Sequence, residues 1–481
     1  MSLPFDLRSI NKQILFFNWE MAPALRKSGQ STPRKAQHLV VLVHGLWGNP
    51  GHLDYVAKSL RDRYGDEELV VLACRRNLGS LTYDGIEVGA ERVAREVEDA
   101  LEELGRDGHK ITRFSIIGYS LGGLVARYTI GLLYHKGLFN RISPINFTTF
   151  ATPHLGVRTP LTGYQNHLWN VLGARTLSTS GRQLFLIDNF RNTDRPLLSV
   201  LADPDSIFIH ALARFQNRSL YTNIVNDRTA VFYTTGISRC DPYVDMGKIN
   251  LHYLKGYEPV ILDPEHPCDL IPEQELPTFY QRFRMHSQTY LRRAPILLAL
   301  VVLLPIATIA FLVNSGIQTF RSRRRIQLHE ADHRDEGFGL YRIPWMVQDM
   351  RIGLEDAFEN VNAAQQQEYL PEGAEEIADA IVEAPALSSA AFAQTTESLL
   401  SEKSESDQAP LAERSPNFPT LALTTAQFAM IKALDDVGLR KFPVYIHKSS
   451  HSHAAIIVRF PKAAFEEGKL VVKHWLDNFQ I

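Results

Sequence analysis

A serine between two glycines is the clearest chemical signal in this sequence of 481 residues. The run Gly118-Tyr119-Ser120-Leu121-Gly122 lies between an apolar strand-like segment, 114–117, and an apolar helix-like segment, 121–134. A serine hydroxyl is a weak nucleophile unless it is exposed beside a base. A tight strand-to-helix turn exposes it, and the flanking glycines allow the backbones to approach. The sequence therefore predicts Ser120 as the nucleophile of an acyl-transfer reaction.

A second glycine-rich loop, His44-Gly45-Leu46-Trp47-Gly48, follows an apolar run at 37–43. Acyl transfer creates an oxyanion, which preorganised backbone N–H groups must stabilise. In folds with this serine motif, one donor is the residue after the nucleophile, here Leu121, and the other comes from the loop after an upstream strand, here Leu46. Alone, the loop would be an ordinary strand-ending turn. Together with the serine motif it indicates an oxyanion hole made by Leu46 and Leu121.

An acid and a histidine should follow the serine in the chain, in that order. Asp227 comes directly after a candidate strand at 220–225, although Asn-Asp sequences also favour simple turns. The base should lie in a loop after a late strand, and 443–447 is such a strand. The residues alone therefore leave His451 and His453 as alternatives for the base.

The elements around these motifs predict how they are positioned. Continuous apolar strands alternate with amphipathic helices, which is typical of a mostly parallel sheet covered on both faces. The sequence therefore predicts the α/β-hydrolase fold, with helices on both faces of the sheet. We expect strands at 37–43, 69–73, 114–117, 147–150, 220–225, 443–447 and 454–460, and helices at 87–104, 121–134 and 424–437.

Five separated stretches resemble a known family, the lipase-like eukaryotic serine esterases, and among them the fungal phospholipases of lipid droplets. They are HLVVLVHGLWGNPGHL from His38, IIGYSLGGLVARY from Ile116, FATPHLG from Phe150, NIVNDRT from Asn223 and HAAIIVRF from His453. The resemblance covers about residues 35–240 and 418–478. It implies hydrolysis of glycerolipid acyl esters without a cofactor, and assigns Ser120 as nucleophile, Asp227 as acid and His453 as base.

An almost unbroken apolar run, 295–313, lies between the predicted acid and the predicted base. Its length approaches that needed to cross a bilayer. A single crossing would separate the three catalytic groups, and arginines flank the run on both sides, as cytosolic flanks do. Pro305 would also bend a helix near the middle. We therefore expect 279–325 to anchor the protein from the cytosolic side without crossing; a buried core helix is the alternative.

The remaining organisation follows from composition. The segment 363–417 is rich in Ala, Glu, Ser, Gln and Pro and predicts a disordered acidic linker. Residues 161–172 predict either a lid over an acyl site or a helix packed on the sheet. The expected division is a main hydrolase part, an anchor, a connecting segment, the linker and a C-terminal hydrolase part carrying the histidine: 1–275, 279–325, 326–362, 363–417 and 418–481.

Charge and cysteine content exclude other classes. A formal net charge of -2 argues against a nucleic-acid partner. Three scattered cysteines predict reduced, buried thiols and no metal site. Residues 1–30 have no apolar signal-peptide core, so we expect the cytosolic face of lipid droplets or of the endoplasmic reticulum membrane, with a glycerolipid substrate. The alternatives are a hydrolase of soluble esters or thioesters, and a non-catalytic membrane tether on a hydrolase scaffold.

Overall fold

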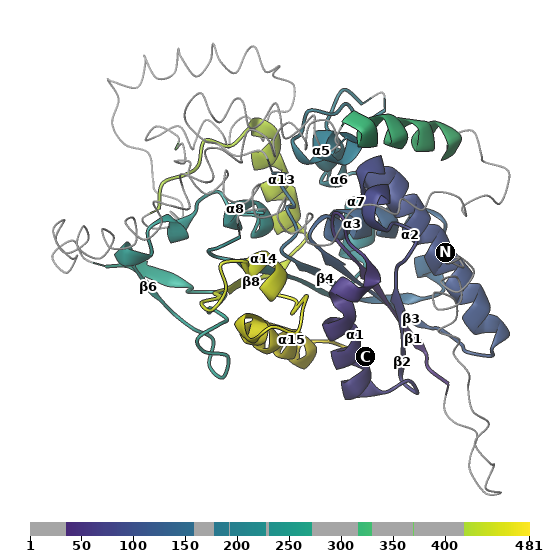
Figure 1. Ribbon diagram of the computed structural model, residues 1–481, viewed down its shortest axis with the longest axis horizontal. Coiled ribbons are helices and arrows are strands. Elements are labelled where there is room, and N and C mark those ends of the chain that lie inside the picture. The colour runs from purple at the N-terminus through teal and green to yellow at the C-terminus, as the bar shows by residue number, and fades with distance from the viewer. Residues whose placement is uncertain are drawn as a thin grey trace, which may run out of the picture. The chain divides into compact units, whose positions relative to one another are not determined.

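Six parallel strands form the central sheet of the computed structural model (Figure 1). Their order is β2-β1-β3-β4-β5-β8, and every neighbouring pair is parallel. The strands are β1 (His38–Val43), β2 (Leu69–Ala73), β3 (Arg113–Tyr119), β4 (Ser143–Phe150), β5 (Asn217–Asn223) and β8 (Arg440–Val444). Because the strands are parallel, their carboxyl ends meet along one edge of the sheet.

The structure describes residues 35–157, 178–191, 193–227, 230–271, 316–329, 369 and 418–481. The predicted lid at 161–172, the apolar run at 295–313 and nearly all of the predicted linker at 363–417 lie outside these residues. Within the described ranges, no helix is both long enough and apolar enough to span a membrane. The same ranges contain no cluster of three or more side chains suited to hold a metal ion.

Both faces of the sheet are buried, as the alternation along β1 shows. Leu39 and Val41 belong to one apolar core, whereas Val40 and Leu42 belong to another. The first core is closed by α2 (Ile86–Arg106), α3 (Leu121–His135) and α7 (Ile207–Ala213), and the second by α1 (Asp54–Tyr64) and α15 (Glu466–Asp477). This three-layer arrangement confirms the predicted α/β-hydrolase fold.

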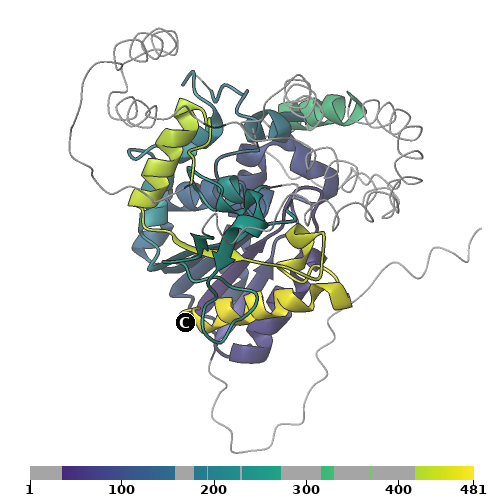
Figure 2. The same ribbon diagram turned by 90° about the vertical axis from the view of Figure 1, so that its left-hand side faces the viewer.

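The last segment of the chain completes the same sheet. β8 pairs with β5 in register, from Ser219 opposite Arg440 to Asn223 opposite Val444. Before it, α13 (Thr425–Asp436) begins at a capping box formed by Thr424 and Gln427. After it, α15 packs beside α1 at the other end of the chain, and Figures 1 and 2 show these late elements in yellow against the early ones in purple. Residues 418–481 therefore belong to the folding unit that begins at Lys35.

Two strand predictions near the C-terminus need correction. The predicted strand 454–460 is wrong, because 452–455 form the short helix α14 (Ser452–Ala455) and turns follow it. Short apolar runs that are buried on all sides have no period that separates strand from helix. The predicted strand 443–447 lies three residues earlier, as β8.

The prediction of reduced, buried thiols is correct for one cysteine of the three. Cys74 is buried, whereas Cys240 and Cys268 are half-buried, and all three are free.

The remaining elements lie outside the main sheet. A two-stranded antiparallel pair, β6 (Ile249–Leu251) and β7 (Cys268–Leu270), lies apart from the main sheet. A further helix spans 316–329. The others are η1 (Pro50–Leu53), η2 (Gly79–Asp84), η3 (Leu138–Asn140), α5 (Ser178–Leu184), α6 (Leu197–Leu201), α8 (Phe232–Thr235), η4 (Pro242–Val244), η5 (Met246–Lys248) and η7 (Ala463–Phe465).

Candidate active site

Ser120 occupies the sharp turn between β3 and α3. Its backbone has φ 55° and ψ −131°, a conformation that residues with a side chain rarely adopt. The turn is possible because neighbouring glycines leave room for other backbones: a Cβ at Gly122 would lie 2.2 Å from the carbonyl oxygen of Val43. The predicted strand-turn-helix setting of this serine is therefore present, and the turn presents its side chain at the carboxyl edge of the sheet.

Three side chains from distant parts of the chain meet at this turn. Ser120 Oγ lies 2.9 Å from His453 Nε2, and His453 Nδ1 lies 2.8 Å from Asp227 Oδ2. A carboxylate can only accept, so Nδ1 carries the proton and Nε2 is left to accept from the serine hydroxyl. The serine and the histidine are each 8% exposed, and the aspartate 7%. The structure thus brings together the three residues that the sequence singled out, with the tautomer that a general base requires.

The aspartate is held by two further donors. Asn223, the last residue of β5, donates from Nδ2 to Asp227 Oδ2 at 2.9 Å. The backbone N–H of Ala230 donates to Asp227 Oδ1 at 2.9 Å. These contacts fix the carboxylate plane toward the histidine. Asn223 was missed by the sequence analysis, and its only signal was its place at the start of the NIVNDRT stretch.

The histidine is positioned through its backbone and its neighbours. Tyr119 donates from its hydroxyl to the carbonyl oxygen of His453 at 3.0 Å, and the two rings lie 5.1 Å apart. Ser452 donates from Oγ to the carbonyl oxygen of Val225 at 2.9 Å, which ties α14 to the loop that carries the acid. Tyr119 and Ser452 were not predicted as site residues. Their roles depend on contacts between segments more than 200 residues apart in the chain.

Of the two candidate histidines, His453 has its ring between the serine and the aspartate. His451 is the N-cap residue of α14, and its backbone N–H donates to Ser449 Oγ at 3.1 Å. The ambiguity that remained in the loop 448–453 is thus resolved at the level of position.

The loop after β1 passes directly against the serine. A Cβ at Gly45 would lie 2.7 Å from the Cβ of Ser120, so only glycine fits there. Two residues after Gly45, the backbone N–H of Trp47 donates to Thr82 Oγ1 at 3.0 Å. Within the described residues, the N–H groups of Leu46 and Leu121 donate to no other backbone group outside the helix ladders, and Leu121 is the first residue of α3. The two predicted donors thus flank the nucleophile.

The stretch Thr152-Pro153-His154 braces the serine turn from behind. Thr152 donates from Oγ1 to the carbonyl oxygen of Ser120 at 2.9 Å. His154 is fully buried, and its Nε2 lies 2.9 Å from Thr149 Oγ1 of β4. Burial, aided by the nearby charge of Arg127, holds the pKa of His154 well below its ordinary value. The ring is therefore neutral, and its contact with Thr149 ties it to the sheet.

Residues 33–242 match the family described as "Putative serine esterase (DUF676)". The matched range contains Ser120 and Asp227 and ends before His453. The chain is 33% identical over 214 residues to "Putative lipase ROG1" of Saccharomyces cerevisiae, which covers 43% of this chain and 29% of the relative. It is 29% identical over 209 residues to "Putative lipase C4A8.10" of Schizosaccharomyces pombe, covering 42% and 26%. The resemblance to serine esterases is confirmed.

The match spans less than a third of the length of these two relatives. Among solved structures, "Phospholipase PlaB from Legionella pneumophila" is 16% identical, with a TM-score of 0.25 and coverage of 41% of this chain and 40% of that one. The rice cell wall degrading esterase LipA from Xanthomonas oryzae is 17% identical, with a TM-score of 0.21 and coverage of 42% and 69%.

Proposed function

We propose that the protein is a serine-dependent lipid acyl hydrolase that cleaves carboxylic esters of glycerolipids at a lipid-droplet or membrane surface. The observation that carries the proposal is the pair of hydrogen bonds that joins Ser120 to His453 and His453 to Asp227, at 2.9 and 2.8 Å. The match to a serine esterase family and the naming of its relatives as lipases agree with it.

The chemistry follows from this geometry. His453 Nε2 removes the hydroxyl proton as Ser120 Oγ attacks the ester carbonyl, and Asp227 stabilises the charged imidazole. The oxyanion of the tetrahedral intermediate accepts from the N–H groups of Leu46 and Leu121. Its collapse expels the alcohol, which takes the proton from His453 and leaves an acyl group on the serine. A water molecule, deprotonated by the same histidine, then attacks the acyl-enzyme and releases the carboxylic acid.

A lipid surface is proposed because of the chain between the acid and the base. The apolar run 295–313 has arginines on both sides and no acid between residues 281 and 325. Residues before and after the run contact the same folding unit: Leu262 donates its N–H to the carbonyl oxygen of Pro443 at 2.9 Å, and Arg325 contacts Asp84 at 2.7 Å. These contacts support an anchor that enters the membrane from the cytosolic side and returns.

Labelling by a fluorophosphonate probe tests the proposal most directly. The wild-type protein should be labelled and should release fatty acid from phospholipid or acylglycerol. Ser120→Ala should lose both properties, because the hydroxyl is the proposed attacking group, while its circular dichroism spectrum stays unchanged. Residual activity within about tenfold of wild type would remove Ser120 from the nucleophile role, since loss of a triad serine removes far more.

The same assays separate the alternatives. Labelling with turnover of short soluble esters or acyl thioesters, but none of dispersed lipid, would favour a soluble-substrate hydrolase. A folded wild-type protein that is neither labelled nor active on any ester would favour a non-catalytic tether on a hydrolase scaffold. A panel of purified phospholipids and acylglycerols then decides the preferred head group and acyl position.

A further inference from the structure

The helix 316–329 turns its polar side inward. The positions it buries are Gln318, Ser322 and Arg325, which recur at the spacing of one helix face. In a helix that packs on the core of a soluble protein, the inward face is normally the apolar one. In this helix the polar side faces the protein and the apolar side chains face outward, so the exposure of that apolar face needs an explanation.

A buried carboxylate holds the inward face in place. Asp84, the last residue of η2, is 1% exposed and accepts from Ser322 Oγ at 2.7 Å and from Arg325 Nη2 at 2.7 Å. Arg92 of α2 donates to the same carboxylate at 2.7 Å. Charge-assisted bonds of this kind are short and directional. They hold the helix in one rotational position, so its opposite face points outward in a defined way.

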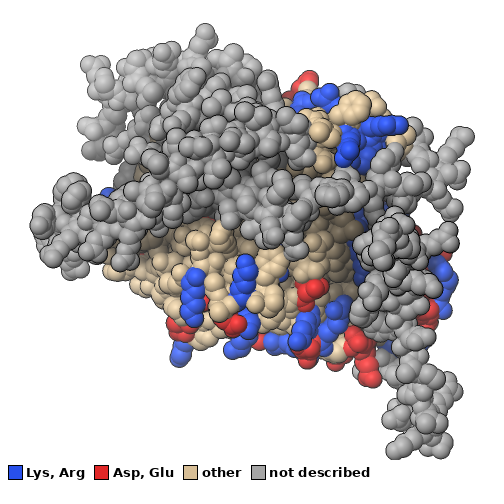
Figure 3. Space-filling view, in the orientation of Figure 1, with Lys and Arg blue, Asp and Glu red and all other residues tan. Residues whose placement is uncertain are grey.

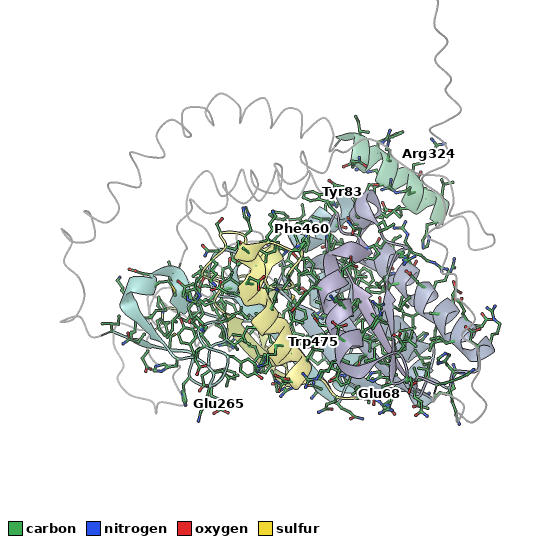
Figure 4. All side chains as sticks on the ribbon, turned by 60° about the horizontal axis from the view of Figure 1, so that its bottom comes forward. Glu68, Tyr83, Glu265, Arg324, Phe460 and Trp475 are labelled. Atoms are coloured by element: carbon green, nitrogen blue, oxygen red, sulfur yellow. The ribbon has the colours of Figure 1, made fainter. Side chains whose placement is uncertain are left out.

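The outward face combines large apolar side chains with arginines. Phe320 is 72% exposed, and Ile317 and Leu328 are each 47% exposed. Between them lie three exposed arginines, Arg321, Arg323 and Arg324. Figure 3 shows this helix, at the upper right, as basic side chains with uncharged ones between them, and Figure 4 labels Arg324 on it. No carboxylate in the described part of the chain pairs with these three arginines.

We infer that the exposed face of helix 316–329 binds the anionic head groups of a lipid surface. Helices that lie in a membrane interface place aromatic and aliphatic side chains beside arginines in this way, and each arginine near an anionic surface adds attraction. The helix also follows directly after the apolar run 295–313. The inference rests on the proposed function in one respect: the surface it binds is taken to be the one that presents the ester.

The docked helix lies close to the proposed oxyanion loop. Arg325 Nη2 also donates to the carbonyl oxygen of Ser80 at 3.0 Å, within η2. Two residues later, Thr82 accepts the N–H of Trp47, the neighbour of Leu46. The same short segment therefore carries the lipid-binding helix on one side and supports the Leu46 loop on the other. A lipid surface bound to the helix would lie beside the mouth of the site.

Vesicle co-sedimentation of the full chain tests the inference. The vesicles are phosphatidylcholine alone or phosphatidylcholine mixed with phosphatidylserine. The triple variant Arg321→Gln, Arg323→Gln, Arg324→Gln should bind the mixed vesicles roughly 100-fold more weakly than wild type, at about 1 kcal/mol per arginine. It should keep wild-type hydrolysis of a short soluble ester. The matched triple Lys58→Gln, Arg61→Gln, Lys110→Gln removes the same charge from other exposed positions and should bind as wild type does.

Two outcomes would overturn the inference. One is unchanged binding of the mixed vesicles by the helix variant, or an equal loss in the matched variant. The other is a helix variant that binds the mixed vesicles as wild type does but no longer binds a soluble acidic polypeptide. That result would make the face a protein interface. Phe320→Ala should weaken binding to both kinds of vesicle. If wild type hydrolyses no ester at all, the proposed function fails, while the comparison of vesicles still decides the role of the helix.

Discussion

At the scale of single residues, Ser120 stands in a strained backbone conformation that its neighbours enforce. Thr152 Oγ1 donates to the carbonyl oxygen of Ser120 at 2.9 Å. Gly45 has no side chain, which lets the loop after β1 lie directly against the side chain of Ser120. Strain of this kind costs about 1–3 kcal/mol and persists only where the surrounding structure determines it. Its cost is consistent with a serine whose hydroxyl must be held against His453.

The two histidines of the late loop should differ sharply. His453→Ala should remove ester hydrolysis to the level of Ser120→Ala, because no other ring lies between the serine and the acid. His451→Ala should retain most activity, since its position caps α14 and lies outside the chain of hydrogen bonds described above. Steady-state rates on a soluble ester check both. The opposite pattern would transfer the base to His451.

The acid should matter through the tautomer that it selects. Asp227→Asn would place an amide N–H where the carboxylate now accepts from Nδ1 at 2.8 Å, so Nδ1 would accept, the ring proton would move to Nε2, and Nε2 would have no lone pair for the serine hydroxyl. A loss of about 10⁴-fold in kcat is expected, with little change in KM. A fall of less than about tenfold would mean that another group orients His453. Asn223→Ala should have a smaller effect, because the backbone N–H of Ala230 still holds the carboxylate.

At the scale of elements, the buried carboxylate under helix 316–329 should be important for stability. Asp84→Asn would remove the negative charge that pairs with Arg92 and Arg325. Removing one member of a buried ion pair lowers the free energy of unfolding by about 3–5 kcal/mol. The measurement is urea unfolding. Asp99→Asn breaks an exposed pair with Arg76 and serves as the control, with an expected cost below about 1 kcal/mol. Equal midpoints for the two variants would mean that the buried cluster does not stabilise the fold.

The elements also mark how far sequence can predict this protein. β1, β2, α2 and α3 were predicted to within two residues at each end, because apolar runs in a parallel sheet are continuous and end at glycine turns, whereas α1 was not predicted and only the second half of β4 was. The strand prediction for 454–460 was wrong. Ile456 and Ile457 are buried in turns beside α15, and a short run of buried β-branched residues has no period that distinguishes a strand from other structure. Tyr119 and Asn223 escaped notice because their importance lies in single contacts that only the folded chain creates.

At the scale of the whole molecule, buried neutral histidines should make the fold sensitive to acid. Burial lowers the pKa of His38 and of His474 to about 4. Both pKa values lie below the value near 6.5 of the unfolded chain, so the unfolded state binds more protons between pH 6.5 and pH 4. The free energy of unfolding is therefore unaffected by these groups above pH 6.5 and decreases as pH falls toward 4. Each histidine should lower the free energy of unfolding by about 2 kcal/mol at about pH 5.

Urea unfolding at neutral pH and at about pH 5 measures this loss. His474→Gln, which keeps an acceptor for the hydroxyl of Tyr221, should lessen the pH dependence by about half of the combined effect. An unchanged dependence in that variant would show that other groups control the acid sensitivity.

The topology of the proposed anchor can be tested from both ends of the folding unit. A tag inserted after Glu265, an exposed residue labelled in Figure 4, and a tag after Ile481 should both be cut by protease in sealed microsomes. The reason is that the described residues on both sides of the run, between 35 and 271 and again at 316–329 and 418–481, belong to one folding unit, which cannot have a membrane through it. Protection of only one tag would mean that 295–313 spans the bilayer. In that case the contact between Ser120 and His453 could not form in the cell.

The contact between Ser120 and His453 also has a consequence in time, because the two residues lie 333 positions apart in the chain. At about 5–20 residues per second, a ribosome adds the histidine roughly 15–70 s after the serine. From residue 313 to residue 453, a stretch of 140 residues that takes about 7–28 s, the growing chain already carries the apolar run but lacks the strand and helix that bring the imidazole to the hydroxyl. A chain released in that interval is expected to be inert. With the run as the proposed anchor, the chain would reach a membrane before its serine could be activated.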